Sequence, residues 1–257
     1  ASGYTTFTVS PKPGLAVGTY TATVTVGPSA LNQYPLNAVT FTVSFEVLDT
    51  TTDADWVDVD GRSYTEMGVT MINDDTLLIM SNTLSNGWYI VQDDLSVTTL
   101  TIGTDVKIII ANDVTFTVAN GISVPIFGSL YVYSQPLGPG DTDIGTMTRT
   151  GSTGNTVTLN NSKITNTANI SSPGSIAINA IGFNAFVLNG ITGSIQGGNV
   201  SAIFLDNSSG NVGKVNNYGS IQGSWGVRVT GNNGVVNNFA NMTSTEDSAW
   251  TFPAVYT

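Results

Sequence analysis

The amino-acid sequence predicts an all-β protein whose main part is a parallel β-solenoid. A short phrase returns with drift at intervals of roughly 20–30 residues, which is the period range of solenoid repeats. It reads VTLNN at 157–161, FVLNG at 186–190, GKVNN at 213–217 and GVVNN at 234–238. Further apolar runs lie between these phrases, and the pentapeptide GSIQG occurs twice, at 193–197 and 219–223. Each repeat can bury its apolar side only by stacking on its neighbour, as the coils of a solenoid do.

The repeats also predict where individual side chains lie. Because each coil buries its face on the next, the apolar residues at the centre of the phrases are expected to stack in one inward column. These residues are Leu159, Leu188, Val215 and Val236. The Asn-Asn pairs are expected at the bends of the coils, since Asn tolerates the left-handed conformation and its amide can bond to the same position one coil away.

Composition predicts a protein that works outside the cell. Charged residues make up 10% of the 257 residues and the net charge is −11, with no Cys and no His. Phosphate binding requires a basic face, so nucleic acid is disfavoured as a partner, and so is an anionic membrane surface. No apolar run reaches the length of a membrane span. We expect a secreted or cell-surface protein, and a chain that begins at Ala1 fits either a processed protein or a fragment of a longer one.

The first 49 residues form a separate segment. Alternating Thr and apolar residues predict half-buried antiparallel strands at 4–9, 19–26 and 39–47. GLAVGTY at 14–20 and FTVSF at 41–45 resemble the last strands of the immunoglobulin-like domains of bacterial surface proteins. A complete sandwich of this kind has about seven strands in about 100 residues. The resemblance therefore implies the C-terminal half of an immunoglobulin-like sandwich over residues 1–49.

The rest of the chain divides by composition. Residues 50–87 are an acidic boundary segment that also starts the solenoid, and 88–244 carry its short β-branched runs. A Gly/Pro/Thr-rich stretch at 135–153 predicts an excursion loop, and 245–257 an aromatic strand. The runs from 88 onward resemble right-handed parallel β-helices of bacterial surface proteins, and NNYGSI at 216–221 is similar to phrases of autotransporter passengers. We therefore expect a right-handed parallel β-solenoid preceded by a partial immunoglobulin-like sandwich.

The repeats lack the residues that cleave polysaccharides. Hydrolysis requires two carboxylates, one as acid and one as base or nucleophile. Asp206 is the only Asp or Glu between residues 150 and 244. Elimination requires calcium-binding acids beside a base, and Lys163, Lys214 and Arg228 have no acidic cluster near them in the sequence. We predict that the protein is not an enzyme and has no cofactor, with calcium as the one candidate.

Two groups of residues are candidate ligand sites. Asp53, Asp55, Asp58 and Asp60 precede a Gly turn, and such alternating carboxylates can supply several of the oxygens that Ca²⁺ requires. Their spacing does not match an EF-hand loop, and the alternative is an acidic, solvated linker. Aromatic residues of the solenoid are candidates for a sugar-stacking platform, or else for core and end-cap positions. They are Trp88, Tyr89, Tyr131, Tyr133, Tyr218 and Trp225.

Two functions follow as expectations. The first is a structural subunit of an extracellular fibre, sheath or surface layer that self-associates through exposed β-edges. Half a sandwich favours it, and so does the aromatic tail, in which Trp250, Phe252 and Val255 are candidate anchors for donating a strand to another copy. The alternative is an adhesin or carbohydrate-binding module of a larger surface protein, with surface glycans as partners.

Overall fold

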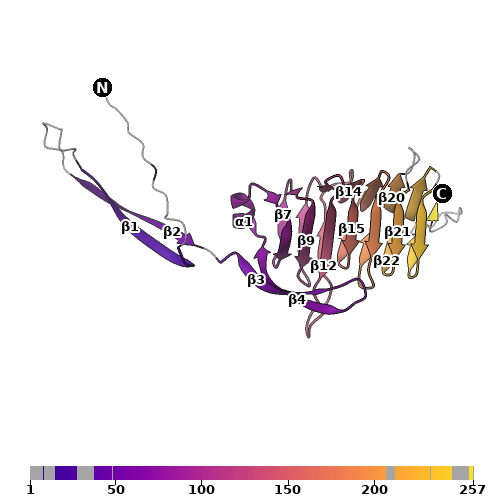
Figure 1. The fold of residues 1–257 in the computed structure, drawn as a ribbon, viewed down its shortest axis with the longest axis horizontal. Helices are drawn as coiled ribbons and strands as arrows, with labels where there is room; N and C mark the ends of the chain where they lie inside the picture. The colour runs from indigo at the N-terminus through magenta and orange to yellow at the C-terminus, as the bar shows by residue number, and fades with distance from the viewer. Residues whose placement is uncertain are drawn as a thin grey trace, which may run out of the picture. The chain divides into compact units, whose positions relative to one another are not determined.

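The computed structural model of the chain divides into two units, Ala1–Thr50 and Thr51–Thr257. It describes Thr8, residues 15–27, 38–47, 49–206, 212–231 and 233–244, and the backbone of residues 255–256. Figure 1 shows a hairpin in the first unit and a stack of short strands in the second. Nearly all regular structure in the described residues is β-strand, with one short helix. The all-β fold class is therefore confirmed.

An antiparallel hairpin forms the described part of the first unit. β1 (Gly18–Val26) pairs along its whole length with β2 (Val39–Val47). Thr, Ser and Glu46 occupy one face and apolar residues the other, because successive side chains of a strand point to opposite faces. On the apolar face the rings of Tyr20 and Phe45 stack with centroids 5.5 Å apart. Of the strand predicted at 4–9, residues 4–7 and 9 lie outside the described residues, so the expected half of an immunoglobulin-like sandwich is not confirmed.

The second unit is a parallel β-solenoid of about 6 turns, as the sequence predicts. Its coils build three sheets (Figure 1). The nine-stranded sheet has the order β24 (Val235–Asn238), β21 (Lys214–Asn217), β18 (Phe186–Asn189), β15 (Lys163–Asn166), β12 (Ser129–Ser134), β9 (Asp105–Ile110), β6 (Gly87–Val91), β4 (Ser63–Met71) and β3 (Thr51–Val57).

The other two sheets are parallel throughout. The seven-stranded sheet has the order β25 (Met242–Ser244), β22 (Ser220–Gly223), β19 (Ser194–Gln196), β16 (Asn169–Ser171), β13 (Thr146–Thr148), β10 (Thr115–Val118) and β7 (Leu95–Val97). The six-stranded sheet has the order β11 (Ile122–Val124), β14 (Val157–Asn160), β17 (Ile178–Ile181), β20 (Ser201–Asp206), β23 (Trp225–Thr230) and β26 (Val255–Tyr256). A short pair precedes it, β5 (Thr83–Leu84) and β8 (Thr101–Ile102).

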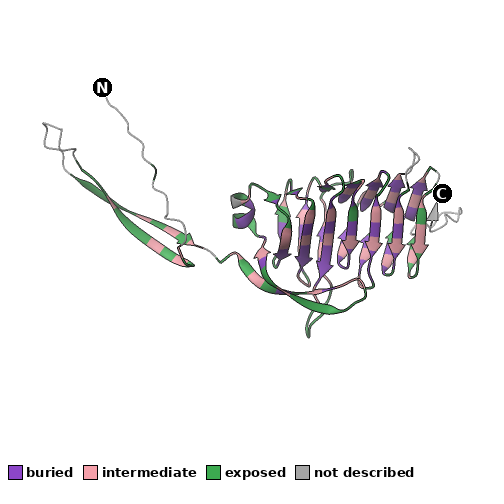
Figure 2. Ribbon diagram, in the orientation of Figure 1, coloured by how far each residue is buried: buried purple, intermediate pink, exposed green. Residues whose placement is uncertain are grey.

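The core of the solenoid consists of apolar columns, one residue per coil, and Figure 2 shows these buried positions along the stacked strands. Nearly every member is buried, which explains why the repeats keep an apolar residue at each equivalent position. The nine-stranded sheet contributes Val106, Leu130, Ile164, Val187, Val215 and Val236. The seven-stranded sheet contributes Leu95, Phe116, Met147, Ile170, Ile195, Ile221 and Met242.

The predicted column of Leu159, Leu188, Val215 and Val236 is wrong in its first two members. Leu159 lies on β14 of the six-stranded sheet, where it pairs with Val124 and Ala180. Leu188 lies on β18 but pairs with Asn216, one residue past the column, and faces outward. Because strand side chains alternate, a one-residue error in register moves a side chain to the opposite face.

Asparagines at the end of the strands of the nine-stranded sheet form a ladder, which confirms in part the role predicted for the Asn pairs. Asn217 and Asn238 belong to such pairs, whereas Asn166 and Asn189 do not. The expected left-handed backbone is absent from these four residues and occurs instead at Asn161, with φ of 51°. Nδ2 of Asn166 donates to Oδ1 of Asn189 at 2.9 Å, Asn189 to Asn217 at 2.8 Å, and Asn217 to Asn238 at 2.7 Å. The first three side chains are fully buried. Each amide also donates to a backbone carbonyl beyond the bend, those of Ala168, Gly193, Gly219 and Ala240.

The predicted excursion loop at 135–153 is two loops on either side of β13. Residues 135–145 leave the solenoid after β12, and Met147 then returns to the core. Asp113 anchors this first loop, since its carboxylate accepts hydrogen bonds from the hydroxyl of Thr142 at 2.6 Å and from the N–H of Asp143 at 2.9 Å. These bonds, with that of the Thr142 N–H, lower the pKa of Asp113.

A short helix that the sequence analysis does not predict covers the start of the solenoid. α1 (Asp74–Ile79) begins at a capping box, in which Asn73 and Thr76 exchange hydrogen bonds of 2.9 Å. Leu77 points into the core, whereas Leu78 is exposed. α1 has 6 residues, and no helix in the described part of the chain has the length and apolar character of a membrane span.

Candidate functional site

The acidic segment proposed for calcium forms a hairpin, which we call the strap. It consists of residues 51–71, in which β3 and β4 pair antiparallel. The strap joins the nine-stranded sheet where Met71 of β4 pairs in parallel with Ile90 of β6. Figure 1 shows it running along the outside of the coils.

The four Asp side chains bond separately to groups of the strap instead of converging, and that of Asp60 pairs with Arg62 at 3.9 Å. Oδ1 of Asp53 accepts from the N–H of Gly68 at 3.1 Å, and Asp55 accepts from the Thr65 hydroxyl. Oδ1 of Asp58 accepts from the N–H groups of Asp60 and Arg62, which closes the turn. Among the described residues no three Asp, Glu, His or Cys side chains lie together as a metal site. The geometry therefore gives a calcium site at Asp53, Asp55, Asp58 and Asp60 no support.

The tip of the strap is held against coils far along the chain. The hydroxyl of Thr167 donates to the carbonyl of Val57 at 2.9 Å, and the N–H of Ile191 donates to the carbonyl of Val59 at 3.0 Å. Gly190 permits this approach, because a Cβ there would lie 2.8 Å from the Cα of Val59. The strap thus connects the coil of β6 to the coils of β15 and β18.

A second apolar layer lies between the strap and the outer face of the nine-stranded sheet. Ala54 and Val69 of the strap cover Ile90, Ile109 and Tyr133, and all five are buried. The sequence also carries a signal for this layer. Ile108, Ile109 and Ile110 are consecutive, and a strand covered on both faces is apolar throughout instead of alternating.

Aromatic side chains gather where the strap crosses the coils. The ring of Trp56 lies 4.5 Å from Tyr133, 5.2 Å from Trp88 and 5.1 Å from Tyr64, measured between centroids. Tyr131 stacks on Tyr133 at 5.9 Å. Burial is the main cause that raises the pKa of the Tyr133 phenol, and the neighbouring Tyr131 raises it further. These rings pack on one another, so this cluster is chiefly the strap's contact with the coils.

The six aromatic residues predicted as a platform lie in separate places. Trp88, Tyr131 and Tyr133 belong to the strap contact, while Tyr89 is buried in the core. Tyr218 stacks on Phe239, with centroids 4.8 Å apart, and Trp225 lies against Arg228 in another sheet. One continuous platform made by all six is therefore absent.

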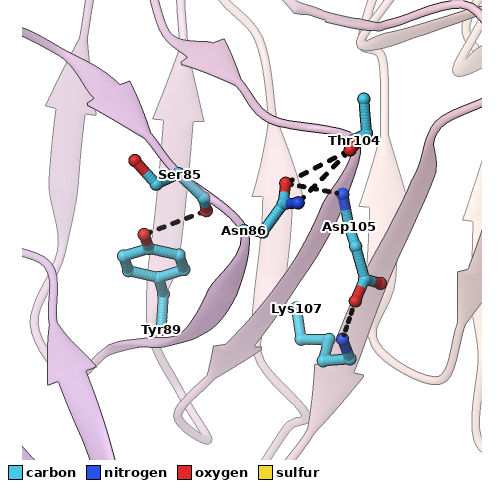
Figure 3. A network of polar contacts seen from close by, with 6 residues as sticks. All are labelled: Ser85, Asn86, Tyr89, Thr104, Asp105 and Lys107. Carbon is cyan, nitrogen blue, oxygen red and sulfur yellow. Dashed lines mark hydrogen bonds and ion pairs between the residues drawn. The ribbon is translucent and has the colours of Figure 1, made fainter.

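A polar network joins the first two coils on the border of the strap contact (Figure 3). Oδ1 of Asn86 accepts from the N–H of Asp105 at 3.0 Å, and the Asn86 amide donates to the Thr104 hydroxyl at 3.3 Å. Asp105 in turn pairs with Lys107 at 2.6 Å. Nζ of Lys107 lies 5.8 Å from the ring centroid of Trp88 and 5.3 Å from that of Tyr131. The charge of Lys107 is thus already balanced by groups of this chain.

A hollow on the corner between the six-stranded and nine-stranded sheets contains two lysines that, unlike Lys107, have no ion-pair partner among the described residues. Its centre is a column on the outer face, in which Phe186 pairs with Lys163 on one side and with Lys214 on the other. The hollow has a volume of about 360 Å³. Phe127, Asn161, Asn184, Ala185 and Val212 complete the lining.

The rim of the hollow exposes large apolar side chains. Phe127 of the lining is 77% exposed, and Phe183, whose N–H donates to the lining residue Asn161, is 58% exposed. Phe127 also has φ of 61°, in the left-handed region, where a bulky residue is a conformational outlier. The N–H of Phe127 donates to the carbonyl of Asn161 at 3.1 Å, which fixes this turn to the next coil.

Asp206, the only carboxylate between residues 150 and 244, bonds to a neighbouring coil. It ends β20, and its Oδ1 accepts from the Thr230 hydroxyl one coil on at 3.1 Å. No second carboxylate exists between residues 150 and 244 to pair with it for glycoside hydrolysis.

Comparison of the chain with protein-family models, with curated proteins and with solved structures yields no match.

Proposed function

We propose that this chain is a non-catalytic structural subunit of a bacterial-type extracellular assembly, such as a fibre, sheath or surface layer. In this proposal the solenoid is a rigid rod, and copies join through the β1–β2 hairpin. The protein is secreted or displayed at the cell surface, a proposal that rests on its weakly charged composition. The absence of paired carboxylates in the later coils supports a non-catalytic role.

The observation that carries the proposal is the exposure of the hairpin. None of the residues of β1 and β2 is buried, and Phe41 on the apolar face is 38% exposed. An isolated two-stranded hairpin is only marginally stable in water, and exposed edges favour the addition of strands. We propose that the hairpin of a neighbouring copy supplies these strands and completes part of an immunoglobulin-like sandwich.

A charge on the apolar face tests this proposal. Val43 and Thr42 are neighbours on β2 and point to opposite faces, so Val43→Lys and Thr42→Lys form a matched pair. We expect the full chain to form oligomers whose mass rises with concentration in analytical ultracentrifugation. Val43→Lys is expected to abolish them and Thr42→Lys to preserve them. A chain that stays monomeric at all concentrations contradicts the proposal.

The aromatic tail provides a separate arm of the same experiment. Trp250 and Phe252 lie outside the described residues, and Val255 pairs with Val227 of its own six-stranded sheet. If the neighbouring hairpin is the donor, deletion of residues 249–257 leaves assembly intact. If the tail is the donor, that deletion gives monomers.

Binding of surface glycans is the second candidate function, and the hollow around Phe186 favours it. Ligand sites combine apolar walls with a few polar groups, which is the composition of this lining. Titration of the full chain with polysaccharides tests whether any binding occurs.

A further inference from the structure

Two lysines of the hollow carry charges that the described part of the chain does not neutralise. Lys163 and Lys214 are two of only seven basic residues in a chain of net charge −11. The described ion pairs involve Arg62 and Lys107, and neither Lys163 nor Lys214 has an ion-pair partner among the described residues. Two cations on one column, in a region with a single carboxylate, create a local positive field on an acidic protein.

The spacing of the two lysines suits a ligand that lies along the rod. They are two strands apart, so their backbones are separated by about 9–10 Å at the usual strand spacing. Phe186 lies between them and faces outward, because its neighbour Val187 is buried in the core. A ligand that spans both lysines must therefore cross the ring of Phe186.

The lining combines three kinds of group. Lysines bind carboxylates through charge-assisted hydrogen bonds. Aromatic rings such as Phe186 and Phe127 offer apolar surface to the C–H face of a sugar. Asn184 offers an amide to hydroxyl groups, whereas the Asn161 amide already accepts from the N–H of Phe183 at 2.6 Å and donates to Oδ1 of Asn160 at 3.4 Å.

We infer that the hollow formed by Lys163, Phe186, Lys214 and Phe127 is a binding site for acidic sugar residues of a glycan. This inference rests on the second function proposed above and names its ligand class and residues. An acidic peptide could satisfy the lysines but has no sugar ring to place against the two phenylalanines. A nucleic acid is opposed by the net charge of the whole chain.

The first experiment compares ligands. Calorimetric titration of the full chain uses an oligomer of galacturonic acid, its methyl ester, which has the same ring without the charge, and oligoglutamate. We expect binding of the acidic oligomer, weakening with added salt, and little binding of the other two. Equal affinity for the methyl ester overturns the acidic class, while glycan binding as a function then stands. Equal affinity for oligoglutamate overturns the sugar class. Failure of every saccharide to bind overturns both the inference and the second function.

The second experiment locates the site. Lys163→Gln and Lys214→Gln are each expected to weaken binding of the acidic oligomer about tenfold, the loss typical of one charge-assisted hydrogen bond. Phe127→Ala removes an exposed ring, so the variant should fold normally, and it is expected to weaken binding by about threefold or more, in line with a lost ring contact. Lys107→Gln is the matched control, because it removes a lysine beside the aromatic cluster under the strap. Loss of binding in Lys107→Gln, with unchanged affinity in the other variants, would move the site to that cluster and overturn the inference.

Discussion

The side-chain amide of Asn166 donates to the side-chain oxygen of Asn189 one coil away, at 2.9 Å, and both residues are fully buried. A buried amide is costly unless its donors and acceptor are satisfied. Nδ2 of Asn189 donates to Asn217 and also to the carbonyl of Gly193. The ladder therefore satisfies itself only when each coil holds its neighbours in register.

Asn189→Ala should destabilise the solenoid by about 2–4 kcal/mol, because it leaves buried partners unpaired and opens a small cavity. Asn216 is the matched control on the neighbouring strand, since it faces outward and accepts one bond, from Asn237. Asn216→Ala should change stability by about 0.5 kcal/mol or less. Urea unfolding of the variants measures both, and equal losses would contradict a special role for the buried ladder.

Gly190→Ala should loosen the tip of the strap. Its Cβ would meet the Cα of Val59 at 2.8 Å, a backbone atom that can move only if the strap moves. Arg62 at the exposed turn of the strap then becomes a better trypsin site. We expect faster cleavage after Arg62, followed by mass spectrometry, while cleavage after Arg149 keeps its rate.

Thr167→Val tests the same contact without a clash. It keeps the shape of the side chain but removes the hydroxyl, which donates to the carbonyl of Val57 and also accepts from the N–H of Ser134. It should speed cleavage after Arg62 less than Gly190→Ala does. If neither substitution changes that cleavage, the tip is not held by these contacts.

The sequence predicts the stacking of the coils but neither the strap nor the register of the strands. Stacking of the coils could be predicted because the repeats require neighbours. Bonding between asparagines of successive coils could be predicted for Asn217 and Asn238, which lie in recurring Asn pairs, but not for Asn166, which lies in no such pair. The register of the strands could not be predicted, because a drifting phrase aligns equally well when it is shifted by one residue. Leu188 is the example, since the repeats assign it to the inward column that Val187 occupies. The acidic residues of the strap suggested a ligand site because carboxylates suit both calcium and turn closure, and only the backbone partners of Asp58 distinguish the two. The hollow was hidden because Lys163 and Lys214 are far apart in the chain and meet only through the register with Phe186.

Stability should fall as the pH rises above the ordinary tyrosine pKa of 10.0. Burial raises the pKa of Tyr133 in the folded state, so the unfolded chain releases this proton at a lower pH than the folded chain does. The contribution is fully present below the unfolded pKa and is lost as the pH rises toward the folded one. Tyr133→Phe should flatten this fall in urea unfolding measured from pH 8 to 11, and an unchanged slope would contradict the assignment to Tyr133.

Leu77 and Leu78 of α1 provide the test of the cap at the start of the solenoid. Leu77 is 1% exposed and packs on the core, whereas Leu78 is 79% exposed. Leu77→Ala should lower the free energy of unfolding by about 2–5 kcal/mol, and Leu78→Ala should leave it nearly unchanged.

Leu77→Asp should displace the helix and uncover the first coil, whose strand edges can then pair with other chains. In the background of Val43→Lys, in which the hairpin is not expected to assemble, light scattering should show new aggregation for Leu77→Asp and none for Leu78→Asp. Equal scattering by the two variants would mean that α1 does not protect this end.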